Sequence, residues 1–275
     1  MVYDVIVIGG GPAGISAGLT LRRRNKSVAI VTGPLADIPL YKSHCVDNYP
    51  GMPDVSGKDM LEIMADQAVK AGVTVLHGRA TSILPMGDTF GIGVGQEFYQ
   101  SRAVILATGV TSGKPFPGEE EFLGRGVSYC VTCDGMLYRN KKVCVVGFTA
   151  ETEEEAQLLR DMGCQVEVFT KRGRYAVEGQ GNVERLIVGE DVYPCDGVFI
   201  LRPAIKADTL LEGLKTDGAH ILVDRSMRTN IPGVFAAGDC VGQPYQIPKA
   251  VGEGNIAALS ADHFLQQQKG DQNDG

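Results

Sequence analysis

The sequence predicts an α/β fold with two similar domains, each built around a strand–helix–strand unit. The first unit comprises an apolar segment at residues 2–8, a helical pattern at 15–25 and a second apolar segment at 27–33. The same plan returns at 141–147, 151–163 and 164–172. Strands that alternate with amphipathic helices are typical of parallel sheets, because each crossover helix covers one face of the sheet. The two units differ in sequence, so we interpret them as two similar domains rather than a short-period repeat.

Composition and charge argue against several classes of protein. The 275 residues suffice for one large or two ordinary domains, and a hydrophobic content of 44% suffices for packed cores. The net charge of -7 argues against a nucleic-acid binder and favours small-molecule or protein partners. No apolar run approaches a membrane span, and the N-terminus lacks the basic leader of a secretory signal. We therefore expect a cytoplasmic protein without a membrane partner.

The remaining predicted elements complete the two domains. In chain order they are a helix at 58–71, short strands at 73–78, 90–95 and 97–100, a buried strand at 103–109, a Gly- and Pro-rich linker at 110–126, strands at 195–202 and 233–240, and a C-terminal helix at 246–268.

The motif GxGxxG, formed by Gly9, Gly11 and Gly14, lies between the first strand and the first helix. The first glycine permits a tight turn, the second lets the backbone approach a pyrophosphate, and the third lets the helix pack against the sheet. The helix N-terminus adds free amides and a positive dipole. The motif predicts a dinucleotide site, although the second strand ends at Thr32 and Gly33 without the usual acidic residue for a ribose.

The segment SYCVTCDG places Cys130 and Cys133 two residues apart, with Asp134 directly after them. Such a pair can close a redox disulfide, in which one thiolate attacks and the other resolves, and the adjacent carboxyl can move a proton. Zinc is the rival interpretation, but it normally needs four ligands, and no second cysteine pair or paired histidines accompany this one. We predict a redox pair and no metal site. The other cysteines in apolar strands, Cys144, Cys164 and Cys195, are interpreted as small core residues.

Five motifs in order resemble one family over nearly the whole chain: GGGPAG at 9–14, DNYPG at 47–51, ILATG at 105–109, CVTCDG at 130–135 and IPGVFAAGDC at 231–240. They are similar to the low-molecular-weight thioredoxin reductases. The resemblance implies two Rossmann-like domains of three-layer ββα type, with the second inserted in the first. The FAD-binding domain would comprise 1–112 and 218–275, and a redox-disulfide domain 113–217. It also implies a homodimer and a thioredoxin-like protein as partner.

The resemblance assigns roles to particular residues. Cys130 and Cys133 would form the redox disulfide, with Asp134 as the acid–base group. The residues that would contact FAD are Gly9, Gly11, Pro12, Ala13, Gly14, Asn48, Ala80, Ala107, Thr108, Gly109, Gly238, Asp239, Gln246 and Ile247.

The second domain departs from the family pattern at its own nucleotide loop. Family members resemble GGGxxA there, whereas this chain keeps Gly147 but has Thr149 and Thr152 at the next two glycine or small positions. Four acids crowd the same helix start: Glu151, Glu153, Glu154 and Glu155. They suit the helix dipole but repel a pyrophosphate. The basic pair Lys171 and Arg172 remains, so charge alone does not exclude NADPH. Residues 171–194 leave little room for a helix and further strands.

We therefore expect an FAD-dependent enzyme that takes electrons from reduced ferredoxin or flavodoxin, like the ferredoxin-dependent members of the family. Two alternatives stay open: an NADPH-dependent thioredoxin reductase with a degenerate loop, and a non-catalytic flavoprotein that senses its disulfide state. An acidic donor would need a basic patch, and the candidates are 22–26, 141–142 and 171–174, each of which is otherwise an ordinary solvated surface.

Overall fold

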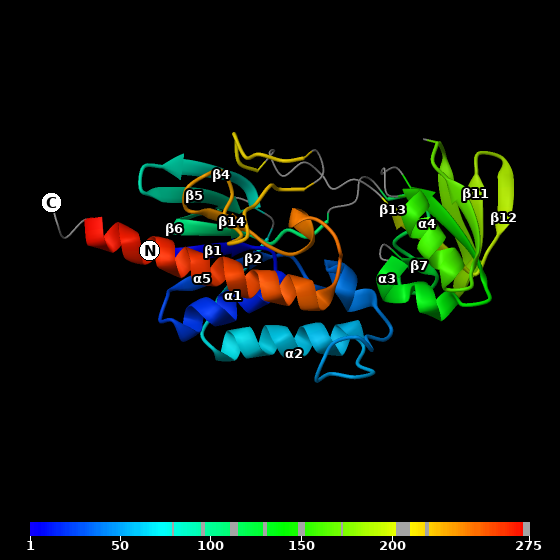
Figure 1. The fold of residues 1–275 in the computed structure, drawn as a ribbon, viewed down its shortest axis with the longest axis horizontal. Helices are drawn as coiled ribbons and strands as arrows, with labels where there is room; N and C mark the ends of the chain where they lie inside the picture. Colours follow the sequence, from blue (N-terminus) through cyan, green and yellow to red (C-terminus); the bar gives the residue numbers. More distant parts are fainter. Residues whose placement is uncertain are drawn as a thin grey trace. The chain divides into compact units, whose positions relative to one another are not determined.

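The computed structural model describes residues 1–78, 80–94, 97–110, 115–128, 131–147, 152–171, 173–201, 210–217 and 220–271. The chain divides into two compact units, Met1–Val110 with Ala204–Gly275, and Thr111–Pro203. Each unit combines a parallel sheet with helices, so the predicted α/β class is confirmed (Figure 1). In the part of the chain that the structure describes, no helix combines the length and the apolar character needed to cross a membrane.

The first unit is built on a seven-stranded sheet. Its strands are β1 (Val2–Ile8), β2 (Val28–Thr32), β3 (Thr74–His77), β4 (Ala80–Met86), β5 (Thr89–Val94), β6 (Glu97–Leu106) and β14 (Val234–Ala236). The order is β3-β2-β1-β6-β5-β4, and β14 also pairs with β6. Strands β1, β2, β3, β6 and β14 run parallel, whereas β4, β5 and β6 form an antiparallel meander. Strand β6 thus belongs to both parts of the sheet.

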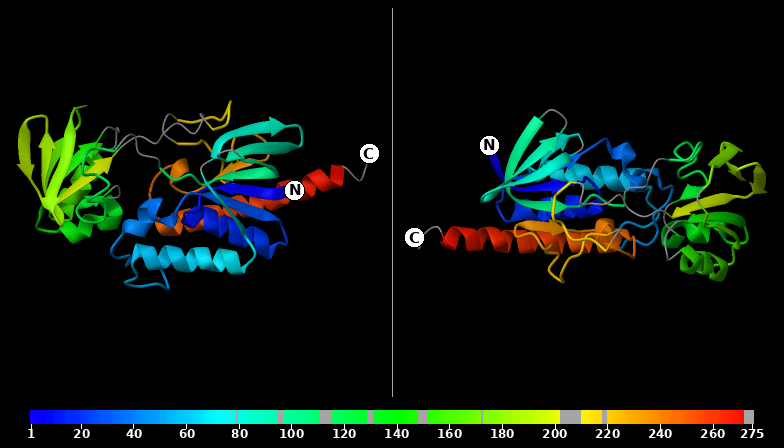
Figure 2. Two further views of the ribbon diagram at one scale, coloured as in Figure 1. Left: turned by 180° about the vertical axis from the view of Figure 1, so that it is seen from behind. Right: turned by 90° about the horizontal axis from the view of Figure 1, so that it is seen from above.

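Helices α1 (Pro12–Arg23) and α5 (Ile247–Asp271) lie side by side against one face of this sheet, and α2 (Gly57–Lys70) packs beside α1 (Figure 2). The contact between α1 and α5 is unusually close. A Cβ placed on Gly254 of α5 would lie 2.1 Å from the Ala13 oxygen. The Ser16 hydroxyl donates to the Val251 oxygen at 2.7 Å, and Asn255 donates to Thr20 at 3.1 Å.

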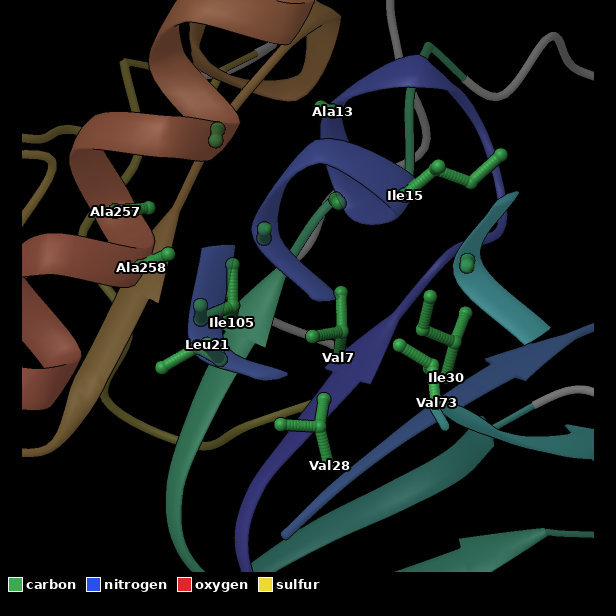
Figure 3. Close-up of a cluster of buried hydrophobic side chains, with 14 of the residues drawn as sticks. Val7, Ala13, Ile15, Leu21, Val28, Ile30, Val73, Ile105, Ala257 and Ala258 are labelled. Carbon is green, nitrogen blue, oxygen red and sulfur yellow. The ribbon is translucent and has the colours of Figure 1, made fainter. Parts of the chain in front are cut away.

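The core under these helices consists of small and branched apolar side chains (Figure 3). Val7 and Ile105 rise from adjacent strands, Leu21 comes down from α1, and Ala257 and Ala258 come from α5. All five are fully or almost fully buried. Burial of a side chain such as Leu21 stabilises the fold by about 1.5–3 kcal/mol. Because alanine side chains are small, α5 can pack close to the sheet.

The second unit has a four-stranded parallel sheet in the order β7-β13-β8-β9 and a three-stranded antiparallel sheet, β10-β11-β12. The strands are β7 (Val127–Ser128), β8 (Lys142–Gly147), β9 (Gln165–Phe169), β10 (Tyr175–Gln180), β11 (Asn182–Val188), β12 (Asp191–Pro194) and β13 (Gly197–Leu201). Val143, Val145 and Phe199 pack under α4 (Thr152–Asp161), together with Val131 of the short helix α3 (Val131–Asp134). Val146 and Leu186 belong to a second apolar cluster, which joins the two sheets.

The described residues 173–194 contain strands β10–β12 and no helix, in line with the expectation that residues 171–194 leave little room for a helix and further strands. These strands are only four to seven residues long and turn at Gly181 and Gly189, which both have positive φ. Two tight turns therefore accommodate a complete three-stranded sheet in this short stretch.

The predicted domain boundaries, 1–112 with 218–275 and 113–217, stay a prediction, because residues 111–114 and 202–209 lie outside the described part of the chain. Leu211 and Leu214 are buried in the core of the first unit, and the Leu210 oxygen accepts a hydrogen bond from the Ile83 amide at 2.8 Å. The expected linker also packs within the second unit, because the Val177 amide donates to the Pro117 oxygen at 2.9 Å.

Replacing Gly254 with alanine should lower the free energy of unfolding by about 1–3 kcal/mol, because the new methyl would overlap the Ala13 oxygen. Gly252→Ala is the matched control. It lies on the same helix with no atom within 4 Å of the new Cβ, and it should raise stability by a few tenths to about 1 kcal/mol. Urea denaturation of both variants measures the difference, and equal effects would contradict the close helix contact.

Candidate functional site

The glycine motif at the start of α1 shows a separate steric reason for each glycine. Gly9 has a φ of +120°, and a Cβ there would lie 2.1 Å from the Ala107 oxygen. A Cβ on Gly14 would lie 1.9 Å from the Gly9 oxygen. Gly11, the N-cap of α1, has no atom within 4 Å of its Cβ position, so its backbone faces open space. That space is where a phosphate would approach the helix N-terminus.

Several predicted residues meet at the same end of the sheet, where the parallel strands finish. The Ala107 amide donates to the Ile8 oxygen at 2.8 Å, and the Ala237 amide donates to the Leu106 oxygen at 2.9 Å. Gly238 follows with a φ of +85°, and its Cβ position is 2.9 Å from the Ala13 Cβ. The structure therefore brings Gly9, Ala13, Ala107 and Gly238 together.

Thr108 and Gly109 continue from Ala107 at the same edge. Thr108 hydrogen bonds to the buried Cys240 thiol. Gly109 has a φ of +65° and no atom within 4 Å of its Cβ position. Like Gly11, it presents bare backbone to open space.

Asn48 and Gln246 are 198 positions apart in sequence but contact each other directly. The Asn48 amide donates to the Gln246 side-chain oxygen at 3.0 Å. Ile247 begins α5 directly after Gln246. Among the described contacts, none joins Ala80 to these residues; Ala80 starts β4, two positions after Gly78, whose amide donates to the Thr32 oxygen at 2.9 Å.

Asp239 begins the short helix η5 (Asp239–Val241), and its carboxyl titrates unusually. Burial raises its pKa to about 6, Lys249 opposes the rise, and Glu253 adds to it. The Lys249 ammonium donates to the oxygens of Gly238, Gly242 and Glu253 at 3.1, 2.7 and 3.0 Å. Glu253 in turn accepts from the Gly238 amide at 2.9 Å. The ion pair therefore fixes both ends of the turn that carries Asp239.

Sequence reasoning missed Lys249 and Glu253. The only signal for them was a lysine four residues before a glutamate at the start of the last helix. That spacing is common on exposed helix surfaces, where it contributes only a few tenths of a kcal/mol. Here both side chains are mostly buried against a glycine turn.

The redox motif lies only partly within the described residues. Cys130 is outside them, and so is the side chain of Cys133, whose backbone belongs to α3. Asp134 ends α3, and its carboxylate accepts a hydrogen bond from the Ser128 hydroxyl at 2.7 Å. Burial, reinforced by the Asp134 and Asp196 carboxylates, raises the pKa of the nearby Tyr138 to about 12. Tyr138 therefore stays protonated at neutral pH.

The start of α4 differs from the start of α1 in sterics and in charge. Residues 148–151 lie outside the described part, but Thr152 is 2% exposed, and its Cγ2 and Oγ1 lie 2.2 Å from a Cβ placed on Gly147. At α1, Gly14 packs directly on the backbone of Gly9. At α4, the side chain of Thr152 packs on Gly147 instead. The first turn of α4 carries Glu153, Glu154 and Glu155, whereas the first turn of α1 has no acidic residue.

Three of the four basic residues at 22–26 make contacts within the first unit. Arg22 donates to the Ala71 and Lys26 oxygens, and both Arg24 and Lys26 pair with Asp262 at 2.9 Å. The cluster spans the C-terminus of α1, roughly 18 Å from the glycine motif for a helix of 12 residues. Arg24 and Lys26 therefore join α1 to α5, and a docking role for the cluster stays a prediction. Of the other candidates, Lys141 lies over the Tyr138 ring at 5.4 Å, and Arg172 falls outside the described residues.

Comparison with known proteins decides the family. A family model described as pyridine nucleotide-disulphide oxidoreductase matches residues 3–178 and 174–254. The chain belongs to this family. A thioredoxin reductase of Listeria monocytogenes is 31% identical, with 98% of this chain and 95% of the relative covered. This pyridine nucleotide-disulphide oxidoreductase is thus a flavin-dependent enzyme with FAD as its cofactor, which argues against the non-catalytic alternative.

Two solved structures show the same fold. Thioredoxin reductase from Streptococcus pyogenes MGAS5005 matches with a TM-score of 0.85 and 28% identity, over 97% of this chain and 99% of the other. A ferredoxin-flavin thioredoxin reductase from Clostridium acetobutylicum matches with a TM-score of 0.63 and 36% identity, over 98% and 99%. Low-molecular-weight thioredoxin reductases are therefore its homologues.

The first unit fits FAD on its own geometry. Open space at Gly11 and the acid-free start of α1 suit the pyrophosphate. When bound, FAD supplies a carrier that accepts and passes on electrons. The residues that would hold it are the glycines at the start of α1, the partly buried carboxyl of Asp239 and the hydrogen-bonded amides of Asn48 and Gln246.

Replacing Asp239 with asparagine should stabilise the FAD-free protein at neutral pH. The folded pKa of about 6 lies above the ordinary value of 3.8, so the carboxyl stabilises the fold fully below 3.8, and that contribution is lost as pH rises through 6. Two pKa units correspond to at most about 3 kcal/mol. The gain of Asp239→Asn over the parent should therefore appear between pH 4 and 7 in urea denaturation.

Asp262→Asn provides a control of opposite sign. Although burial opposes it, hydrogen bonds from Lys26 and Arg24 lower the pKa of Asp262, so its contribution is present above the unfolded pKa and lost as pH falls through the folded one. This variant should lose stability at pH 7. A parallel response of the two variants would contradict the assignment for Asp239.

Proposed function

We propose that this protein is a cytoplasmic, homodimeric thioredoxin reductase whose FAD receives electrons from reduced ferredoxin or flavodoxin. The Cys130–Cys133 disulfide accepts the electrons and passes them by thiol–disulfide exchange to a thioredoxin-like protein. The printed name of the Listeria relative supports the thioredoxin substrate, and that of the Clostridium structure supports the ferredoxin donor. The first unit would then be the FAD domain and the second the redox domain.

The start of α4 is the observation that carries the donor assignment. A pyridine nucleotide would bring its pyrophosphate to this helix N-terminus, where Glu153, Glu154 and Glu155 form the first turn. Each repulsion between unit charges near a surface costs on the order of a few kcal/mol at contact distance. Arg160 offsets only part of this charge, through its 2.8 Å pair with Glu153. The start of α1 has no acidic residue in its first turn and no side chain near Gly11. In this proposal the chain therefore binds FAD at α1 and no pyridine nucleotide at α4.

Each residue at the redox motif has a defined part in this proposal. Cys130 and Cys133 exchange electrons, and Asp134 carries the proton to or from the leaving thiolate. Ser128 positions the Asp134 carboxylate through its 2.7 Å hydrogen bond. FAD is held by the predicted set: Gly9, Gly11, Pro12, Ala13, Gly14, Asn48, Ala80, Ala107, Thr108, Gly109, Gly238, Asp239, Gln246 and Ile247.

An NADPH-dependent reductase is the second candidate. Lys171 is retained next to β9, where a basic residue would meet the 2′-phosphate. Relatives named simply thioredoxin reductase also match over nearly the whole chain. The two candidates share every step after the flavin and differ only in the electron source.

An anaerobic titration of the bound flavin distinguishes the candidates. Reduced ferredoxin should bleach the flavin absorbance, whereas NADPH and NADH at micromolar concentration should leave it oxidised, because the α4 site repels their pyrophosphate. The control is dithionite, which should bleach the flavin in every sample. Rapid bleaching by micromolar NADPH would replace the ferredoxin proposal with the second candidate.

The residues after the redox motif supply a surface for a protein substrate. Met136 and Leu137, two and three positions beyond Asp134, are 57% and 54% exposed. Exposed large apolar side chains beside a reactive motif suit a protein partner. The double variant Met136→Ser/Leu137→Ser should raise KM for thioredoxin about tenfold, equivalent to about 1.4 kcal/mol of lost binding.

Val192→Ser is the matched control for that surface, since Val192 is 56% exposed on β12 of the same unit. It should leave KM unchanged. Reduction of a small aromatic disulfide, which needs no docking surface, should be the same in all variants. An unaltered KM in the double variant would show that thioredoxin does not use this surface.

A further inference from the structure

Cys144 and Cys195, which the sequence suggested were separate core residues, form a pair in the second unit. Cys144 lies on β8, and Cys195 lies between β12 and β13. They are 2% and 6% exposed, and both belong to the apolar cluster between the two sheets. Both line the same small cavity, and each thiol is the largest single influence on the pKa of the other. Neither residue belongs to the Cys130–Cys133 motif.

The surroundings distinguish the two sulfurs. Interactions with the Cys144 thiol and with the backbone of Leu186 and Gly197 lower the pKa of Cys195 despite its burial. The interaction with Cys195, together with burial, raises the pKa of Cys144. Cys195 is therefore the more acidic of the two thiols and the better suited to attack as a thiolate.

A small cavity borders both residues. It has a volume of about 220 Å³ and is lined by Cys144 and Cys195 together with Lys142, Gln165, Glu167 and Pro194. This is below the range of roughly 300–1,000 Å³ typical of sites for drug-sized ligands. A water molecule takes up about 30 Å³, so the cavity admits several waters or a hydroperoxide of similar size. It is too small for a tripeptide disulfide.

We propose that Cys144 and Cys195 are a second redox-active thiol pair, which hydrogen peroxide or a small hydroperoxide converts into a disulfide. The Cys195 thiolate attacks the peroxide, which leaves Cys195 as a sulfenic acid and releases hydroxide. The Cys144 thiol then displaces the sulfenic hydroxyl, so that the S–S bond forms and water leaves. Two electrons pass from the two sulfurs to the peroxide. A dithiol reverses the step by thiol–disulfide exchange.

Cys164 provides an internal comparison. It is also buried in the second unit, but its thiol donates to the Tyr138 oxygen at 3.1 Å, and burial raises its pKa. It does not line the cavity. The proposal therefore expects Cys164 to resist peroxide under conditions that oxidise Cys195, although the two residues are similarly buried.

The test is mass spectrometry of the full-length, FAD-loaded protein after treatment with hydrogen peroxide. Non-reducing digestion should yield a peptide in which Cys144 is linked to Cys195, and dithiothreitol should remove the link. In Cys144→Ser, dimedone should label Cys195 at least about tenfold faster than Cys164, because Cys195 lines the cavity and is the more acidic thiol. In Cys195→Ser, oxidation of Cys144 should disappear.

Each outcome bears on the proposal. Absence of the linked peptide from the peroxide-treated parent protein would overturn it, and this measurement needs no variant to fold. Equal dimedone labelling of Cys195 and Cys164 would also overturn it. Glutathione disulfide should produce the link much more slowly than peroxide, since it does not fit the cavity, and the reverse order would contradict the assigned oxidant. The electron donor of the flavin plays no part in any of these results.

Discussion

Backbone packed directly against backbone around Gly9 is the constraint on which the first unit depends. A Cβ on Gly14 would lie 1.9 Å from the Gly9 oxygen, and a Cβ on Gly9 would lie 2.1 Å from the Ala107 oxygen. At these two contacts β1, α1 and β6 meet. A third contact of this kind joins α5 to α1 at Gly254. The missing Cβ atoms only allow the elements to approach one another. The stabilising free energy comes from the apolar core in Figure 3. Together they leave the α1 N-terminus free of side chains at the place where a phosphate must approach.

The second unit repeats the strand–helix–strand plan without that constraint. Thr152 packs its side chain on Gly147, and glutamates follow in the first turn of α4. The helix is stabilised by its own dipole and by core contacts of Ala156 and Leu159, not by adaptation to an anion. Ser128 and Asp134 meanwhile remain hydrogen-bonded beside the redox motif. This unit thus keeps the strand–helix–strand plan without the bare glycine backbone of the α1 N-terminus, and it keeps the Ser128–Asp134 hydrogen bond beside the redox motif.

Short-range sterics explain why much of the fold was predictable. The motif predicts close backbone contacts at Gly9 and Gly14 and free backbone at Gly11, and the structure shows this arrangement. The contact between Asn48 and Gln246 spans 198 positions, and only family resemblance placed both near the flavin. Lys249 and Glu253 were missed because their spacing is also that of an ordinary surface pair.

Other features depend on tertiary packing that no local pattern encodes. Strands β10–β12 are too short for their periodicity to stand out from a variable loop. The basic cluster at 22–26 resembled a docking surface because its partner, Asp262, lies more than two hundred positions away. The neighbouring thiols of Cys144 and Cys195 belong to segments that meet only when β13 pairs with β8.

Strand β6 has a consequence for the order of assembly during synthesis. Its residues Val104, Ile105 and Leu106 pair with Val234, Phe235 and Ala236 of β14, and α5 covers the same sheet. The first unit therefore stays open, with one face of its sheet uncovered, until nearly the whole chain has left the ribosome. The second unit, Thr111–Pro203, is contiguous and is complete well before that. Consequently the thiol-bearing unit is complete before β14 and α5 can close the long loop that begins at β6.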